Sequence, residues 1–529
     1  MDVFKKNRTR IITLAVLAFL FVTAVQGMET KDWVITVLRG LSVGMVTFLV
    51  AAGLSLILGL MDVLNLAHGE MFMLGAYAGW TVFVRPDTFV DLVPPLTFFA
   101  FGFALMPLWR VIMNGIRVPD RLTSIAPWIL ILAGGAILWA TMLRFPLSIW
   151  NPEVYSESPI TFSLALSQDN LILPDGAAFT AVPALVGILG TLIGSGVLAM
   201  GAAWLGLQRQ AGSISRHIPR STWITAGALV LTGLLFHFGN NGLTEWMLNI
   251  STTTRFFLAM AVATGLGFVI GGLMEITMIR PLYDRPIYQL MITLGLSFIV
   301  IEVVRAVWGR PEFTMPKPAL FSGSGDLCPA TNMGDLLANQ CSTMILFDGR
   351  IRTYNELFII LVGIVVLLLV WLLLQRTRIG MIIRAGVQDS EMVEALGINV
   401  RQVFTFVFAL GVGLAALGGI LAAPSIGLST DMGTRLLLLA LIALAIGGLT
   451  SFPGAAAGAI LVGLLQQFII KYGQLGINIP FLAEPFKPSP PLVPASLCCL
   501  WLLSYWSCHR VYSGEMNKNS INTVMSSII

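Results

Sequence analysis

The sequence predicts an all-α protein, a polytopic bundle of about 10–14 transmembrane helices. Two observations predict this fold class. Hydrophobic residues make up 56% of the 529 residues and charged residues only 11%, whereas soluble domains carry about 25% charged residues. The apolar runs are long and do not alternate, which favours helices over the strands of a membrane barrel. This composition excludes a soluble enzyme, a disordered scaffold and a nucleic-acid-binding protein.

Apolar runs suited to membrane helices follow one another along the chain. We expect spans over residues 11–26, 34–60, 69–84, 95–108, 126–143, 181–206, 222–239, 256–279, 290–308, 355–375, 403–427, 434–450, 454–472 and 490–507. Several are shorter than the roughly 20 residues that cross a bilayer. Half-helices or re-entrant segments are an alternative for these.

Basic residues are distributed unevenly among the segments that connect the spans. Segments 207–221 and 376–402 are rich in arginine, whereas segment 144–180 holds several acidic residues and a single arginine. Basic residues favour the cytoplasmic side of a membrane. We therefore expect 207–221 and 376–402 to face the cytoplasm, and 144–180 and 309–354 to face outward.

Two of the cysteines, Cys328 and Cys341, fall in the expected outer segment 309–354. In an oxidising compartment this pair can form a disulfide, and two free thiols are the alternative. The sequence contains no Walker-type phosphate loop and no pair of histidines at the spacing of metal ligands. We therefore expect no catalytic residues, no metal and no cofactor.

Polar residues interrupt the apolar sequence between the second and third expected spans. Segment 61–75 places Asn65, His68 and Glu70 between two apolar runs. Ionisable residues at membrane depth are costly, so they indicate a functional site such as a translocation path. The alternative is an ordinary cytoplasmic turn in which Asn65 caps the next helix.

Segment 376–402 contains the signals of a short helix over residues 389–397. Asp389 or Ser390 is suited to the N-terminal cap, Glu394 to the helix, and Gly397 to its end. So short a helix is marginal alone in water and needs a surface to pack against. It is either an interfacial helix or a docking helix for a cytoplasmic partner.

Four parts of the sequence resemble permease subunits of ABC importers. The stretch Glu394 to Asn399, Glu-Ala-Leu-Gly-Ile-Asn, resembles the centre of the EAA-type coupling loop of these permeases. Segments 40–79, 265–309 and 403–473 are similar to LivH-type permeases of branched-chain amino acid importers. Related urea and amide permeases share these signatures and remain an alternative. The resemblance assigns ATPase coupling to Arg384, Asp389, Glu394, Ala395, Gly397 and Asn399.

The resemblance also implies the partners and location of the protein. The partners would be ABC ATPase subunits that hydrolyse ATP, a second permease subunit (LivM-like or another copy of this chain), an extracytoplasmic substrate-binding protein and membrane lipid, but no nucleic acid. The location would be the plasma or inner membrane. A stand-alone secondary transporter is a weaker alternative, because Glu275 and Glu302 lie near span ends rather than at mid-membrane.

The resemblance divides the chain into four parts. Residues 1–84 carry the N-terminal signature, and 256–473 form the expected permease core with its coupling loop. Residues 85–255 are expected to be an inserted transmembrane region without a counterpart in the family. Residues 474–529 form an atypical C-terminal tail.

Overall fold

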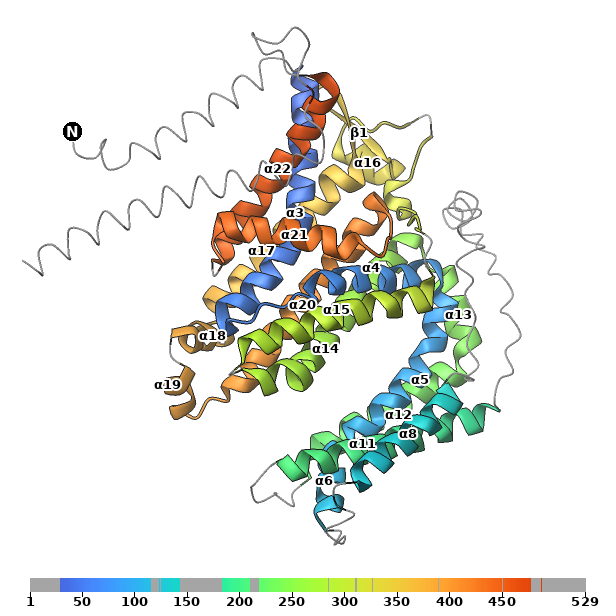
Figure 1. Ribbon diagram of the computed structural model, residues 1–529. Helices are drawn as coiled ribbons and strands as arrows, with labels where there is room; N and C mark the ends of the chain where they lie inside the picture. The colour runs from blue at the N-terminus through green and yellow to red at the C-terminus, as the bar shows by residue number, and fades with distance from the viewer. Residues whose placement is uncertain are drawn as a thin grey trace, which may run out of the picture. The chain divides into compact units, whose positions relative to one another are not determined.

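The computed structural model confirms the all-α fold class (Figure 1). It describes residues 29–115, 123, 125–142, 183–209, 218–283, 285–309, 312–325, 327–388, 390–449, 451–476 and 487. Within these residues, nine helices are long and apolar enough to cross a membrane. The expected spans 11–26 and 490–507 lie outside the described residues.

The chain divides into two compact units, which are described separately. Unit 1 comprises Met1–Trp80 and Phe257–Ile529, and unit 2 comprises Thr81–Phe256. The main helices of unit 1 are α3 (Thr30–Met61), α4 (His68–Val84), α14 (Thr252–Met274), α15 (Pro286–Trp308), α17 (Ile359–Arg376), α18 (Arg378–Gln388), α19 (Ser390–Ala395), α20 (Val400–Ile426), α21 (Met432–Gly447) and α22 (Phe452–Leu475). Helices α4 and α14 cross from one unit into the other.

Helices α3 and α20 form the centre of unit 1, since 83% of the most apolar stretch of each is buried. Small residues let their backbones approach closely, as is usual between membrane helices. A side chain at Gly411 of α20 would meet the carbonyl oxygen of Gly53 in α3 at 2.7 Å. Helix α22 packs along α3 in the same way, with Gly463 facing Gly40 and Gly44.

A small module precedes α17 in unit 1. It contains η3 (Ala319–Phe321), α16 (Met333–Asn339) and an antiparallel hairpin of β1 (Thr343–Leu346) and β2 (Gly349–Arg352), which pairs Thr343 with Arg352. Cys328 and Cys341 are joined by a disulfide with an S–S distance of 1.95 Å. Their neighbours Leu336, Met344 and Ile351 form a small apolar core. The π-helix η4 (Tyr354–Phe358) then leads into α17.

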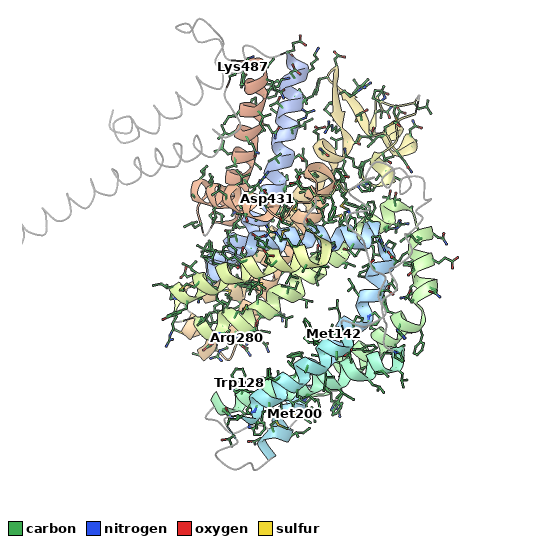
Figure 2. The ribbon with its side chains drawn as sticks, turned by 45° about the vertical axis from the view of Figure 1, so that its right-hand side comes forward. Trp128, Met142, Met200, Arg280, Asp431 and Lys487 are labelled. Carbon is green, nitrogen blue, oxygen red and sulfur yellow. A yellow bond between two sulfur atoms is a disulfide. The ribbon has the colours of Figure 1, made fainter. Side chains whose placement is uncertain are left out.

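Unit 2 is also helical. Its elements are α5 (Pro86–Ala104), α6 (Met106–Gly115), α8 (Ala126–Met142), α11 (Ala184–Arg209), α12 (Arg220–Phe238) and α13 (Asn240–Asn249). Arg85 and Asp87 form a buried two-point ion pair of 3.0 and 2.7 Å at the start of α5. The exposed side of α8 carries Trp128 and Trp139 (Trp128 is labelled in Figure 2). Such apolar exposure suits a surface that faces lipid rather than water.

One expected span had the wrong bounds, and one helix was not expected. The span expected over 95–108 begins at Pro86 and ends at Ala104, and a second helix, α6, follows. The helix contains Pro94 and Pro95 in its interior, as membrane helices with packed neighbours can. Segment 376–402 contains the additional helix α18 before the expected short helix.

Candidate functional site

The segment between α17 and α20 folds into two short helices, α18 and α19, followed by a tight turn. Gly397 adopts a φ of +80°, a left-handed conformation that favours glycine. Its N–H donates to the carbonyl oxygen of Glu394 at 2.9 Å and so closes the end of α19. Asn399 then caps α20, because its side-chain oxygen accepts the N–H of Gln402 at 3.3 Å. This turn connects α19 to the central helix α20.

The other residues expected in the coupling loop lie on the surface of this segment. Arg384 in α18 donates a hydrogen bond to Gln375, and Glu394 and Ala395 are exposed. Asp389 lies outside the described residues. Together these positions leave the polar surface of α18 and α19 accessible.

An apolar edge on α19 is also accessible. Met392 is 60% exposed and Leu396 is 72% exposed, whereas Val393 is 4% exposed. Val393 therefore holds the short helix against its own chain, and the other two side chains project outward. Exposed large apolar residues beside polar ones are typical of a protein interaction site.

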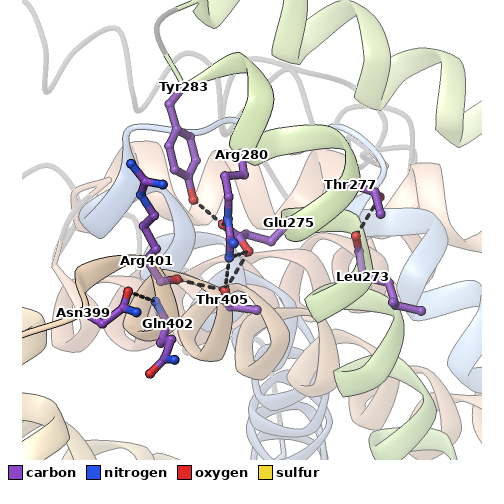
Figure 3. Close-up of polar contacts among 9 residues, drawn as sticks. All are labelled: Leu273, Glu275, Thr277, Arg280, Tyr283, Asn399, Arg401, Gln402 and Thr405. Carbon is purple, nitrogen blue, oxygen red and sulfur yellow. Dashed lines mark hydrogen bonds and ion pairs between the residues drawn. The ribbon is translucent and has the colours of Figure 1, made fainter. Parts of the chain in front are cut away.

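A buried carboxylate connects the next part of α20 to the end of α14 (Figure 3). Glu275 is fully buried at the start of the π-helix η1 (Glu275–Ile279). It accepts hydrogen bonds from Arg280 Nε at 3.1 Å, Arg280 Nη2 at 2.7 Å and Tyr283 Oη. The hydroxyl of Thr405 in α20 donates to Glu275 Oε2 at 2.7 Å. We call Glu275, Arg280, Tyr283 and Thr405 the Glu275 cluster.

Sequence reasoning missed the Glu275 cluster and treated Glu275 only as a residue near a span end. Glu275 and Arg280 are five residues apart, a spacing that does not bring side chains together on an α-helix. The π-helical turn has i to i+5 geometry and brings them onto one face. The pair Glu275 and Arg280 was therefore present in the sequence, but their contact can be predicted only if a π-helical turn is considered.

Asn65, His68 and Glu70 lie together at the start of α4, and all three are at most 1% exposed. The chain between α3 and α4 is not helical. Asn65 Oδ1 accepts the N–H of Ala67 at 3.1 Å, and His68 Nε2 lies 3.2 Å from the carbonyl oxygen of Val50 in α3. This segment therefore combines the geometry of a turn with deep burial inside unit 1.

Glu70 brings three helices together. Its Oε1 accepts the hydroxyl of Ser297 in α15 at 3.2 Å and that of Thr434 in α21 at 2.9 Å. Its Oε2 has no hydrogen-bond partner among the described residues. Gly433 of α21 packs tightly against this oxygen, since a Cβ atom at that position would lie only 2.8 Å from it. A buried carboxylate with one oxygen available is a group able to contact a solute or change its bonding when helices move.

Comparison with known proteins identifies the family. A family model described as "branched-chain amino acid transport system / permease component" matches residues 218–488, about half of the chain. The chain belongs to this family. As a member of the permease family it is a multi-pass membrane protein, which agrees with its nine apolar helices in the described residues.

The similarity to individual permeases is low. The chain is 30% identical to the branched-chain amino acid permease BraD of Pseudomonas aeruginosa over 122 residues, 23% of this chain and 40% of BraD. It is 25% identical to LivH of Salmonella typhimurium over 231 residues, 43% of this chain and 67% of LivH. It is also 30% identical to the fructose import permease FruF of Bifidobacterium longum over 126 residues, 22% of this chain and 34% of FruF. No solved structure matches.

The Glu275 cluster generates a prediction about stability. We expect Glu275→Gln to lower the free energy of unfolding by about 1–3 kcal/mol, because the change leaves buried donors poorly paired. Glu302→Gln is the matched control, because Glu302 forms an exposed pair with Arg305 in α15 that is worth less than about 1 kcal/mol. Thermal unfolding of the detergent-purified full chain measures both. Equal unfolding midpoints for the two variants would contradict the structural importance of the cluster.

Proposed function

We propose that this chain is the membrane-spanning permease subunit of an ATP-driven ABC importer for small polar solutes, with branched-chain amino acids as the first candidates. Membership of the permease family supports this proposal. The observation that carries it is the accessible segment of α18 and α19, which Asn399 joins directly to α20, one of the two central helices of unit 1. The urea and amide permeases named above remain an alternative substrate class, and similarity to the sugar permease FruF makes sugars another.

In this proposal an ATPase subunit binds α18 and α19 from the cytoplasm. The basic residues Arg376, Arg378, Arg384 and Arg401 of this segment favour the cytoplasmic side. The disulfide-linked module before α17 then faces outward, where an extracytoplasmic binding protein would deliver the solute. A second permease subunit, LivM-like or another copy of the chain, would complete the path.

The connections of α20 suggest how a movement of the ATPase subunit would be transmitted to the membrane helices. A displacement of α19 is passed to α20 through the short turn at Gly397 and the cap at Asn399. The Glu275 cluster makes α14 move with α20, since Thr405 and Arg280 share the same carboxylate. Rigid elements joined in this way are the physical connection that coupling between distant sites requires.

The proposal does not depend on residues 85–255 or on residues 474–529. The contacts of unit 2 are largely internal, which supports its assignment as an inserted membrane region that accompanies the permease core. We assign no transport role to either part.

The turn at Gly397 generates a prediction about coupling. Gly397→Val should abolish co-purification of the ATPase subunit and substrate-stimulated ATP hydrolysis, because a β-branched residue resists a φ of +80°. Gly397→Asn is the matched control and should retain both, since asparagine tolerates this conformation. A Cβ atom built at Gly397 has no atom beyond its chain neighbours within 4 Å. Steric clashes would therefore not explain a difference between the valine and asparagine variants. Full coupling in the valine variant would show that the turn does not position the docking segment.

The site of Ala395 allows a second test of the same surface. Ala395 is exposed at the end of α19, so Ala395→Asp should leave folding and membrane insertion unchanged. If position 395 lies in a water-free contact with the ATPase subunit, the variant would bury an unpaired carboxylate there. This would weaken association by about 2–4 kcal/mol. Co-purification at matched expression measures this effect. Undiminished association would place the ATPase contact elsewhere.

The buried group at the start of α4 generates a prediction about the translocation path. Glu70→Gln preserves size but removes the charge, and His68→Ala removes the imidazole that bonds to α3. If this segment lines the path, both variants should reduce uptake of radiolabelled leucine at least tenfold at normal expression, whereas Glu302→Gln should not. Wild-type uptake by both variants would leave the segment with a packing role. Uptake that continues without any ATPase subunit would favour the secondary transporter instead.

A further inference from the structure

Unit 2 contains a groove of about 410 Å³ between the end of α5 and the helix α12. Phe101 and Leu105 line it from the end of α5. The lining residues of α12 are Trp223, Ala226, Gly227, Val230, Leu231 and Leu234. Apart from the indole nitrogen of Trp223, these residues offer no polar side-chain atom. The groove is therefore suited to a hydrocarbon chain.

The groove opens where α12 carries its smallest residues. Farther along α12 the two helices touch, since a Cβ atom at Gly233 would lie 2.5 Å from Cε1 of Phe98 in α5. A Cβ atom at Gly227 would instead meet no atom within 4 Å. Ala226 is buried, whereas the neighbouring Trp223 is 54% exposed. The groove thus has a buried base and an aromatic edge.

Helices α5 and α12 run antiparallel, so the groove lies towards one end of unit 2. Near the start of α5, Asp91 accepts a hydrogen bond from Asn240, which follows α12. Leu105, directly after α5, shares the groove with Trp223 in the first turn of α12. The end of α5 and the start of α12 therefore lie together.

Two exposed arginines belong to this end of unit 2. Arg220 is the first residue of α12, and Arg110 lies in α6, which follows Leu105 directly. Neither forms an ion pair with a residue that the structure describes. Segments 109–121 and 207–221 together contain six arginines and one acidic residue. This end therefore offers positive charge to an anion.

The opposite end of unit 2 differs in charge. Asp91 and Glu245 lie there, and its two arginines are each only 1% exposed. Arg85 is paired with Asp87 at 2.7 Å, and Arg255 Nε donates to a backbone carbonyl oxygen of α13 at 2.8 Å. Among the described residues of unit 2, the accessible arginines are thus concentrated beside the groove.

Helix α6 has the character of a helix at the membrane surface. Trp109 Nε1 donates to the carbonyl oxygen of Gly102 in α5 at 2.9 Å, and Met113 is 5% exposed, whereas Arg110 is exposed. Helices with one apolar face and basic residues on the other lie at the level of lipid headgroups, where tryptophan is also enriched. The arginines and the groove therefore match the two parts of a phospholipid.

We propose that unit 2 binds an anionic phospholipid of the cytoplasmic leaflet, with an acyl chain in the groove and the phosphate beside Arg110 and Arg220. Basic residues favour the cytoplasmic side, and basic pockets between membrane helices on that side bind anionic headgroups. A zwitterionic lipid supplies the same chain but brings an ammonium group to the arginines. Every residue of the site belongs to unit 2, so the proposal does not depend on the permease function.

The test is native mass spectrometry of the detergent-purified full chain, titrated with two lipids. Phosphatidylglycerol and phosphatidylcholine are used with the same palmitoyl and oleoyl chains, so that only the headgroup differs. The dissociation constant for phosphatidylglycerol should be lower by about tenfold or more, because two arginines contribute. Inorganic phosphate should not displace the lipid, because it has no chain to fill the groove.

The variant Gly227→Leu tests the groove, because its side chain would occupy the space of the acyl chain. It should raise the dissociation constant for phosphatidylglycerol about tenfold, as expected when a few methylene groups lose their contacts. Gly135→Leu in α8 is the matched control and should change nothing. A Cβ atom at Gly135 also meets no atom within 4 Å, and Gly135 does not line the groove.

The variants Arg110→Gln and Arg220→Gln test the headgroup contact. Each should raise the dissociation constant for phosphatidylglycerol about fivefold and leave that for phosphatidylcholine unchanged. Arg350→Gln is the control, because Arg350 is an exposed arginine on β2 in unit 1, and it should alter neither value.

Four results would overturn the proposal: equal affinity for the two lipids, displacement by inorganic phosphate, equal affinity of Gly227→Leu and Gly135→Leu, or no difference between the two arginine variants and Arg350→Gln. Thermal unfolding identifies a variant that does not fold. If Gly227→Leu fails in this way, the arginine variants and the comparison of the two lipids still decide.

Discussion

The buried carboxylate of Glu275 fixes the position of α20, and the rest of unit 1 is arranged around that helix. A carboxylate removed from water must have its charge and lone pairs compensated. Arg280 and Tyr283 provide part of this compensation from the segment that follows α14, and Thr405 provides the rest from α20. The two membrane helices therefore cannot separate at this end without exposing a buried charge.

Helix α20 can take this central place because much of its surface is made of small residues. Gly411 meets α3, Gly419 meets the backbone of α4, and Gly413 meets α14. Its first turn follows the accessible segment of α18 and α19, and its last turns line a cavity of about 510 Å³ within unit 1. One helix thus extends from the proposed ATPase contact to this cavity, with the Glu275 cluster between them.

Hydropathy predicted the fold class and most helix positions in the described residues, because apolar length is what a bilayer requires of a helix. It did not predict features that depend on local geometry. The π-turn that joins Glu275 to Arg280 leaves apolar length unchanged, and the start of α5 at Pro86 lies nine residues before the expected span. The cavity could not be predicted, because Arg39, Arg352 and Arg435 are far apart in sequence and meet only after folding.

The central claim is that α19 lies against an ATPase subunit, and site-specific photocrosslinking tests it most directly. A photoreactive amino acid is placed at Leu396, which is 72% exposed on the proposed docking edge, and at Leu337, which is 63% exposed on α16 of the disulfide-linked module. Irradiation of membranes that contain the whole transporter should attach the ATPase subunit at position 396 and not at position 337. Crosslinking of the ATPase at 337, or its absence at 396 in an assembled complex, would contradict the account.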